Sequence, residues 1–176
     1  MGSRLPMGQG KILGQYLAHH QLGCGQSETG MNLTDILVNQ HQQGTYAALL
    51  LSQQSQQQLA SWCQEQGIEH QPAEEFHCTV CYSRQPVPHA EVLNGPVDIT
   101  ADITGWQHLG DDATVRTLES QKLQDLHKLL KRHGASHDYP SYLPHVTVNH
   151  NQQTLPAVVP DFALHFNHIM IRPLED

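Results

Sequence analysis

The chain of 176 residues has no long apolar run and few cysteines. None of its hydrophobic stretches approaches the roughly 18 residues that a membrane-spanning helix needs, so we expect no membrane partner. The four cysteines, Cys24, Cys63, Cys78 and Cys81, occur without a secretory context. This favours free thiols in a reducing compartment over a disulfide framework, and therefore a cytoplasmic location.

Positive charge is also scarce. Nine Lys and Arg residues stand against seventeen Asp and Glu, which gives a formal net charge of −8. Binding to long nucleic acid requires that many phosphates be neutralised, so this balance argues against such a partner. A small phosphate-bearing ligand needs only a local positive site.

The first 30 residues are polar and interrupted by glycines, and they contain no apolar core of a signal peptide. We expect residues 1–30 to be a disordered leader or an artificial addition. Residues 31–176 then form a single domain of two lobes, because the chain is too short for two large independent domains. One active site is expected.

Hydrophobic patterning predicts two helices among several strands. The first helix follows a cap at Ser52 or Ser55 and ends at Gly67, and the second spans 120–133 and ends at Gly134. The predicted strands are 45–51, 76–82, 97–103, 114–118, 145–148 and 162–171. The apolar helix faces consist of Leu59, Trp62 and Cys63 in the first helix and Leu123, Leu126, Leu129 and Leu130 in the second.

The two halves of this pattern repeat each other. A shift of 68 positions (145 minus 77) carries Ser52 onto Ser120, Leu59 onto His127, Trp62 onto Leu130 and His77 onto His145. Strand, helix and strand therefore recur in the same order, which indicates an internal duplication.

Each half contains a strand with the pattern histidine, any residue, threonine, apolar residue. The two copies read His77-Cys78-Thr79-Val80 and His145-Val146-Thr147-Val148. On a strand, the histidine and threonine of each copy point to one face and the other two residues to the opposite face. If a pseudo-twofold axis relates the lobes, both imidazoles and both hydroxyls converge on one cleft.

Such a set suits the cleavage of a phosphodiester without a metal or cofactor. One neutral imidazole takes a proton from the attacking hydroxyl, and the other, as imidazolium, donates a proton to the departing oxygen. The threonine hydroxyls bind the non-bridging oxygens as negative charge develops. We therefore predict His77, Thr79, His145 and Thr147 as catalytic residues.

The paired motifs resemble those of the two-histidine (2H) phosphoesterases, and most of all the phage anti-CBASS nucleases. The segments that carry the resemblance are Gly44-Thr45-Tyr46, Phe76-His77-Cys78-Thr79, Tyr82-Ser83-Arg84, His137-Asp138-Tyr139-Pro140 and Tyr142-Leu143-Pro144-His145-Val146-Thr147. The resemblance covers residues 44 to about 150. It implies an α+β fold with two pseudo-symmetric lobes of antiparallel sheet and outer helices around a central cleft.

The resemblance also implies the substrate. Members of this group degrade the cyclic di- and trinucleotides with which bacteria signal infection, so the expected partner is a small cyclic oligonucleotide in the host cytoplasm. By this similarity Tyr46 contacts a base. We expect cleavage of a 3′–5′ bond by the adjacent 2′-hydroxyl through a 2′,3′-cyclic phosphate. The alternatives are an RNA-end 2′,3′-cyclic phosphodiesterase or ligase of the same fold and a non-catalytic sponge for cyclic nucleotides.

Other local features have competing interpretations. Cys78 and Cys81 are expected on opposite faces of their strand, which argues against a zinc site unless a bulge intervenes. Trp106 is predicted to stack on a base at the rim of the cleft, with core packing as the alternative. Arg84 and Arg172 either meet phosphate or are solvated. Further histidines show no standard ligand spacing; they are His137, His150, His165 and His168.

Overall fold

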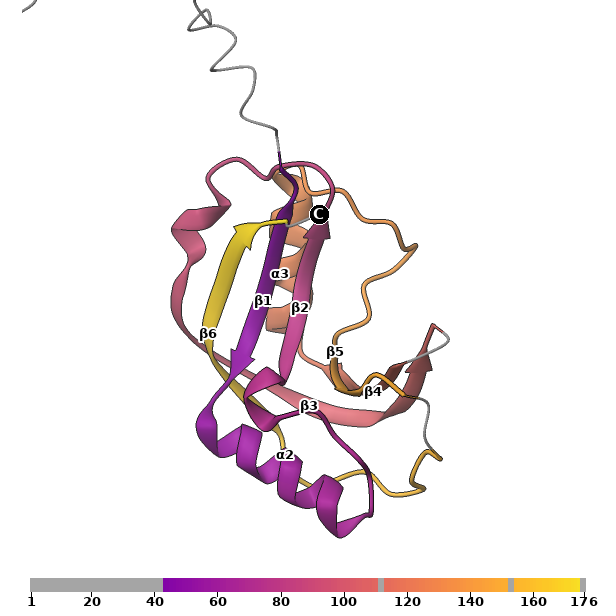
Figure 1. Ribbon diagram of the computed structural model, residues 1–176. Coiled ribbons are helices and arrows are strands. Elements are labelled where there is room, and N and C mark those ends of the chain that lie inside the picture. Colours follow the sequence, from indigo (N-terminus) through magenta and orange to yellow (C-terminus); the bar gives the residue numbers. More distant parts are fainter. Residues whose placement is uncertain (1–42, 111–112, 152–153, 175–176) are drawn as a thin grey trace, which may run out of the picture. The chain divides into compact units, whose positions relative to one another are not determined.

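The computed structural model describes residues 43–110, 113–151 and 154–174 (Figure 1). The expected leader, residues 1–30, and the expected start of the domain at Met31 lie outside the described residues. That boundary therefore stays a prediction.

The described residues form an α+β fold, as the sequence predicts. The strands are β1 (Thr45–Leu51), β2 (His77–Ser83), β3 (Gly95–Leu109), β4 (Ala113–Glu119), β5 (His145–Asn149) and β6 (Leu164–Pro173); the helices are α2 (Gln53–Glu65) and α3 (Gln121–Arg132); and the 3₁₀ turns are η1 (Ala73–Glu75) and η2 (Ala90–Leu93). The largest difference from the prediction is β3, which continues past 103 to Leu109 because β4 pairs with it through Gly105. A glycine there reads as the end of a strand in the sequence alone.

Both helices begin and end where the sequence indicates. Ser52 is the N-cap of α2, and its hydroxyl accepts a hydrogen bond from the backbone NH of Ser55 at 3.3 Å. Ser120 holds the same place before α3. Gly67 and Gly134 follow the helices with φ of 67° and 104°, a region that favours glycine. Among the described residues, no helix is long and apolar enough to cross a membrane.

The six strands form one antiparallel sheet in the order β2-β1-β6-β3-β4-β5. The two halves of the internal repeat lie at the two ends of this order. The unit β1-α2-β2 forms one end, and the unit β4-α3-β5 forms the other. The long strand β3 joins the halves: its first part pairs with β6 and its second part with β4. The strands that carry the two histidine motifs, β2 and β5, are therefore the two edges of the sheet.

Each helix makes contacts with the other half of the repeat. The Nδ1 atom of His127 in α3 donates to the carbonyl oxygen of Val80 in β2 at 2.8 Å, and α3 lies behind β1 and β2 in Figure 1. From α2, Trp62 packs on Trp106 of β3 with ring centroids 5.7 Å apart. Strands from both halves contribute to one hydrophobic core. The two halves of the repeat are therefore packed against each other within the described residues.

A β-bulge changes the predicted placement of the cysteines in β2. Ala47 of β1 lies opposite Cys81, and the next residue, Ala48, lies opposite Thr79, so Val80 is an extra residue in β2. The bulge brings Cys78 and Cys81 to the same, buried side of the sheet. The expectation that they point to opposite faces was wrong for this reason. The described residues contain no group of three or more His, Cys, Asp or Glu able to hold a metal ion.

Candidate active site

The four predicted catalytic side chains lie on the same kind of surface in β2 and β5. His77, Thr79, His145 and Thr147 are half-buried. The residues that alternate with them along each strand are buried in the core. Those core residues are Cys78, Val80, Val146 and Val148. The alternation expected from a half-buried strand is thus present in both motif copies.

The two histidines are held in the same way. The Nδ1 atom of His77 donates to the carbonyl oxygen of Glu75 at 2.7 Å, and Nδ1 of His145 donates to the carbonyl oxygen of Leu143 at 2.8 Å. In each case the acceptor lies two residues before the histidine. Because a carbonyl oxygen only accepts, Nδ1 carries the proton, and Nε2 of the neutral ring is left as the proton acceptor. Both imidazoles are therefore oriented for acid–base chemistry through Nε2.

The two imidazoles also interact electrostatically. Burial lowers the pKa of His145 below its usual value; the hydrogen bond to the Leu143 carbonyl partly opposes this, and the charge of a protonated His77 lowers the pKa further. The charge on His77 therefore acts on the His145 imidazole. Both the burial of His145 and this charge favour its neutral form.

Tyr46, the predicted base-contacting residue, lies beside the first motif. Its hydroxyl is 3.1 Å from the hydroxyl of Thr79, and its ring lies edge-on to His77 with centroids 6.5 Å apart. Burial raises the pKa of Tyr46, while the hydrogen bond with Thr79 opposes this. The phenol is therefore neutral at pH 7 and able to donate or accept a hydrogen bond.

A cavity of about 270 Å³ adjoins His77 and Tyr46. Leu50 and Met170 supply apolar walls, and Arg172 supplies a positive charge. The Arg172 guanidinium carbon lies 5.2 Å from the centroid of the Tyr46 ring. From the sequence, Arg172 either meets phosphate or is solvated, because nothing in its spacing links it to Tyr46. In the structure, the pairing of β1 with β6 places Arg172 opposite Tyr46.

Gln71 and His150 also line this cavity, and the sequence motifs pointed to neither as a site residue. They come from the connections that precede β2 and follow β5. Glu74 and Glu75 lie beside them. The cavity is thus lined by apolar and polar side chains and by groups of both signs of charge.

Trp106 lies on the opposite side of the sheet from the second motif. In the register, Trp106 of β3 is paired with Arg116 of β4, which is paired with Val146 of β5. Cross-strand partners share a face, so Trp106 faces away from His145 and Thr147. The predicted base contact of Trp106 is not supported by this placement, and the alternative of core packing is.

Arg116 is stacked between two indole rings. Its guanidinium carbon lies 3.2 Å from the ring centroid of Trp106 and 4.3 Å from that of Trp62. Burial lowers the pKa of Arg116 to about 9, because the charged form is removed from water. The two indoles offset part of this cost through cation–π attraction. This cluster connects α2 to β3 and β4.

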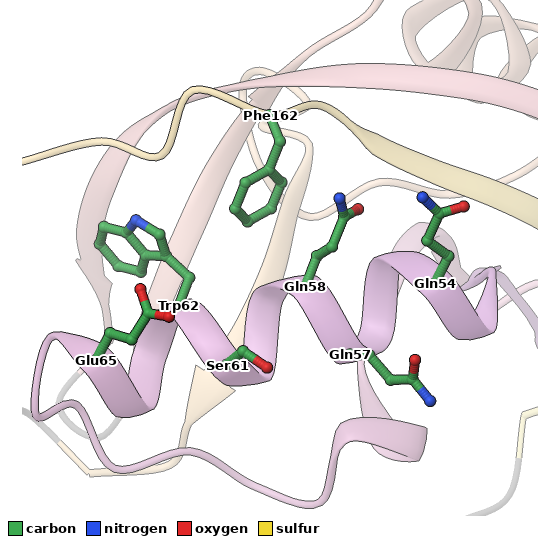
Figure 2. Close-up of a pocket in the computed structure, with 7 residues that line it drawn as sticks. All are labelled: Gln54, Gln57, Gln58, Ser61, Trp62, Glu65 and Phe162. Carbon is green, nitrogen blue, oxygen red and sulfur yellow. The ribbon is translucent and has the colours of Figure 1, made fainter.

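The larger cavity, of about 400 Å³, lies elsewhere (Figure 2). It lies along α2, where Gln54, Gln58 and Trp62 face Phe162 across it. None of its lining residues comes from β2 or β5. It is therefore separate from the histidine motifs.

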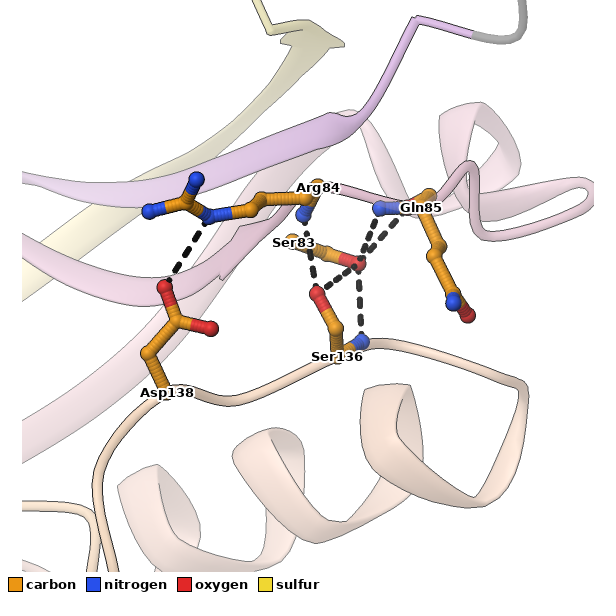
Figure 3. A network of polar contacts seen from close by, with 5 residues as sticks. All are labelled: Ser83, Arg84, Gln85, Ser136 and Asp138. Carbon is orange, nitrogen blue, oxygen red and sulfur yellow. Dashed lines mark hydrogen bonds and ion pairs between the residues drawn. The ribbon is translucent and has the colours of Figure 1, made fainter.

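A polar network ties the loop before β5 to the end of β2 (Figure 3). The Ser83 hydroxyl accepts from the backbone NH of Ser136 at 2.8 Å, and the Ser136 hydroxyl accepts from the NH of Arg84 at 2.8 Å. The Arg84 side chain forms an ion pair with Asp138 at 3.1 Å. The Arg84 side chain is 75% exposed, so it occupies the solvated position considered from the sequence, with Asp138 as its ion-pair partner.

The chain is similar to known proteins over most of its length. The family model described as "Anti-CBASS protein Acb1" matches residues 43–176. The chain is similar to anti-CBASS protein Acb1 of Yersinia phage phiR1-RT (34% identity over 82 residues, 46% of this chain and 53% of the relative) and of Acinetobacter phage Ac42 (30% over 120 residues, 67% and 77%). The alignment thus spans about half the length of the first relative.

Solved structures show the same fold. The chain is similar to a structure described as a phosphoesterase (15% identity, TM-score 0.53) and to E. coli LigT complexed with 3′-AMP (16% identity, TM-score 0.52). Each similarity covers 73% of this chain and 86% of the other. The fold is therefore that of the 2H phosphoesterases, as the resemblance implied.

Proposed function

Because this chain belongs to the anti-CBASS protein Acb1 family, we propose that it is a metal-independent phosphodiesterase that cleaves 3′–5′ bonds of cyclic di- and trinucleotide immune signals. The observation that carries the proposal is the identical tethering of His77 and His145 through Nδ1 to a backbone carbonyl. Two imidazoles tethered in the same way, each with Nε2 left for proton transfer, can act as an acid–base pair. A protein that only binds a ligand has no need of such a pair.

In the proposed complex the scissile phosphate lies between the two motifs. The hydroxyls of Thr79 and Thr147 bind its non-bridging oxygens, where negative charge increases in the transition state. The Tyr46 hydroxyl forms a hydrogen bond with the Thr79 hydroxyl at 3.1 Å, which orients the Thr79 hydroxyl. One nucleoside occupies the cavity beside Tyr46 and Leu50, whose walls suit a base and a ribose.

We assign His145 as the general base of the first step and His77 as the general acid. His145 takes the proton of the ribose 2′-hydroxyl, and the 2′-oxygen forms a bond to phosphorus. The bond from phosphorus to the 5′-oxygen of the next nucleoside breaks, and His77 gives its proton to that oxygen. The ring opens to a linear product that ends in a 2′,3′-cyclic phosphate.

A second step restores the starting protonation state. His77, now neutral, takes a proton from water, the water oxygen bonds to phosphorus, and the 2′-oxygen leaves with a proton from His145. The burial that lowers the pKa of His145 favours its neutral form before the first step. The assignment of His145 as the first base follows from this lowered pKa.

The test is incubation of the purified protein with a panel of cyclic di- and trinucleotides in EDTA, followed by mass spectrometry of the products. The proposal requires a linear intermediate of unchanged mass and then a product heavier by one water. An RNA ending in a 2′,3′-cyclic phosphate is the comparison substrate. Binding of cyclic nucleotides without a change of mass, or opening of the RNA end alone, would contradict the proposal.

A further inference from the structure

The two strands that carry the histidines, β2 and β5, are in contact although they are the two edges of the sheet. β2 pairs only with β1, and β5 pairs only with β4, within the described residues. No ladder of hydrogen bonds therefore sets the distance between the motifs. The carbonyl groups on the free edges still need partners, because unpaired buried carbonyls are costly.

Tyr142 supplies a partner for β2 from the other half of the repeat. It lies in the loop that leads into β5, and its hydroxyl donates to the carbonyl oxygen of Thr79 at 3.1 Å. The ring of Tyr142 is stacked on His127 of α3, with centroids 4.2 Å apart and an interplanar angle of 11°. His127 in turn donates to the carbonyl oxygen of Val80 at 2.8 Å. The tyrosine is therefore fixed on both sides.

Gln71 supplies the corresponding partner for β5. It lies in the connection that leads into β2, and its side-chain amide donates to the carbonyl oxygen of Thr147 at 2.9 Å. Its backbone NH donates to the carbonyl oxygen of Val148 at 2.8 Å. The two motif threonines thus have equivalent partners: each carbonyl accepts a side chain from the loop that precedes the other motif.

Building on the proposed function, we propose that Gln71 and Tyr142 are positioning residues that hold the two motif strands at the separation needed for proton transfer. We call this pair of hydrogen bonds, Gln71 to Thr147 and Tyr142 to Thr79, the reciprocal clasp. It crosses the cleft in both directions. Neither residue contacts the reacting atoms in this arrangement; each acts through the strand that it holds.

The clasp also governs the orientation of the imidazoles. Tyr142 is adjacent to Leu143, whose carbonyl oxygen holds Nδ1 of His145, and Gln71 donates additionally to the carbonyl oxygen of Glu75 at 3.3 Å, the group that holds Nδ1 of His77. Each loop therefore holds the histidine of the motif that follows it and also hydrogen-bonds to the strand of the other motif. Loss of one clasp bond should therefore let the distance between the two strands vary and loosen the Nδ1 hydrogen bond of one histidine.

The test uses two conservative variants. Gln71→Met keeps the length of the side chain, and Tyr142→Phe keeps the stack on His127, so each removes only a hydrogen-bonding group. We expect kcat to fall on the order of 10- to 100-fold, because small misplacements of catalytic groups are this costly, while KM stays within about threefold.

Two matched controls separate positioning from general damage. Gln56→Met removes a glutamine that donates to the carbonyl oxygen of Leu51 at 3.1 Å on α2, and Tyr139→Phe removes the hydroxyl of a 73% exposed tyrosine in the same loop as Tyr142. Both controls should keep the kcat of the parent protein. A clasp variant with parental kcat, or a control with an equal loss of kcat, would overturn the proposal.

A spectroscopic measurement tests the clasp without a substrate. In ¹⁵N-labelled protein, the Nδ1–H signals of His77 and His145 should be sharp in the parent and broadened by exchange with water in both clasp variants, with the amide spectrum otherwise retained. Unchanged imidazole signals in both variants would refute the clasp. If the parent cleaves no cyclic oligonucleotide but the signals broaden as expected, the proposed function fails while the clasp stands.

Discussion

The hydroxyl groups of Tyr46 and Thr79 lie 3.1 Å apart, although 33 positions separate these residues in the chain. The contact joins the predicted base-contacting residue to a predicted catalytic one. It also shows how an adjacent strand supports the motif: Tyr46 comes from β1, which is paired with β2.

The first prediction separates the ring of Tyr46 from its hydroxyl. Tyr46→Phe keeps the stacking surface but releases the Thr79 hydroxyl, so kcat should fall about 3- to 10-fold, the value of one neutral hydrogen bond, with little change in KM. Tyr46→Ala removes the stacking surface as well and should raise KM about tenfold or more, because stacking on a base contributes about 1–3 kcal/mol. Steady-state kinetics on the preferred cyclic oligonucleotide check both values. Equal effects on KM in the two variants would show that the ring does not contact a base.

The second prediction concerns the histidine pair. His77→Ala and His145→Ala should each lower turnover by about 10²–10⁴-fold, because neither proton transfer has a substitute. The control is His165→Ala; this histidine lies in β6, and its Nε2 atom is 2.8 Å from a carboxylate oxygen of Asp98. It should retain the parental rate. Circular dichroism and thermal melts verify that all three variants fold. Cleavage by His77→Ala or His145→Ala within about tenfold of the parent rate would rule out the acid–base assignment.

The third prediction is a bell-shaped pH dependence of kcat/KM. As the base, His145 must be neutral, so activity declines as the pH falls through the pKa of this group; burial and the charge of His77 lower that pKa, which places the acidic limb below the usual histidine value of about 6.5. The alkaline limb follows loss of the proton from the acid partner. The two midpoints belong to the coupled pair. An acidic limb centred above about 7 would be inconsistent with His145 as the base.

Sequence patterning was sufficient to predict both motif strands, both helices and the duplication, because these rest on local periodicity. The reciprocal clasp was not visible, since Gln71 and Tyr142 follow no repeat: the shift of 68 positions carries Gln71 onto Tyr139. Their relation arises only when the edges of the sheet come together. The bulge at Val80 and the face occupied by Trp106 likewise depend on register, and a single extra residue reverses the side to which a side chain points.

The repeat nevertheless identifies one residue that departs from its partner. His127 occupies the position of Leu59, and both are buried. Where α2 has a leucine, α3 therefore places a polar ring that hydrogen-bonds Val80. The histidine gives the bulged part of β2 a hydrogen-bond donor that a leucine cannot supply.

The fourth prediction follows from this buried ring. Burial lowers the pKa of His127, opposed by its hydrogen bond to Val80 and reinforced by His137 and Lys131. Between that lowered pKa and the usual value of about 6.5, the unfolded chain binds more protons, so stability is lost as the pH falls through this window. His127→Leu should reduce the decrease in Tm between pH 7.5 and 5.5; His133→Leu, at an exposed position at the end of the same helix, should not. His145 contributes a dependence of the same sign, so the decrease becomes smaller without vanishing.

The last prediction concerns the nucleophile. A cyclic dinucleotide with every 2′-hydroxyl replaced by hydrogen should bind but remain uncut, because the attacking oxygen is missing while the proposed contacts of Tyr46 with a base and of the threonines with the phosphate are retained. The analogue should therefore inhibit cleavage of the ribose substrate competitively, with an inhibition constant close to the KM of that substrate if chemistry is slow. If water attacks phosphorus directly, the 2′-oxygen has no role in the first step, and the analogue is hydrolysed. Mass spectrometry after prolonged incubation distinguishes the two cases. Rapid cleavage of the deoxy analogue would reject the internal attack and leave the assignment of His77 and His145 as the acid–base pair intact, because both mechanisms need one ring to accept a proton and the other to donate one.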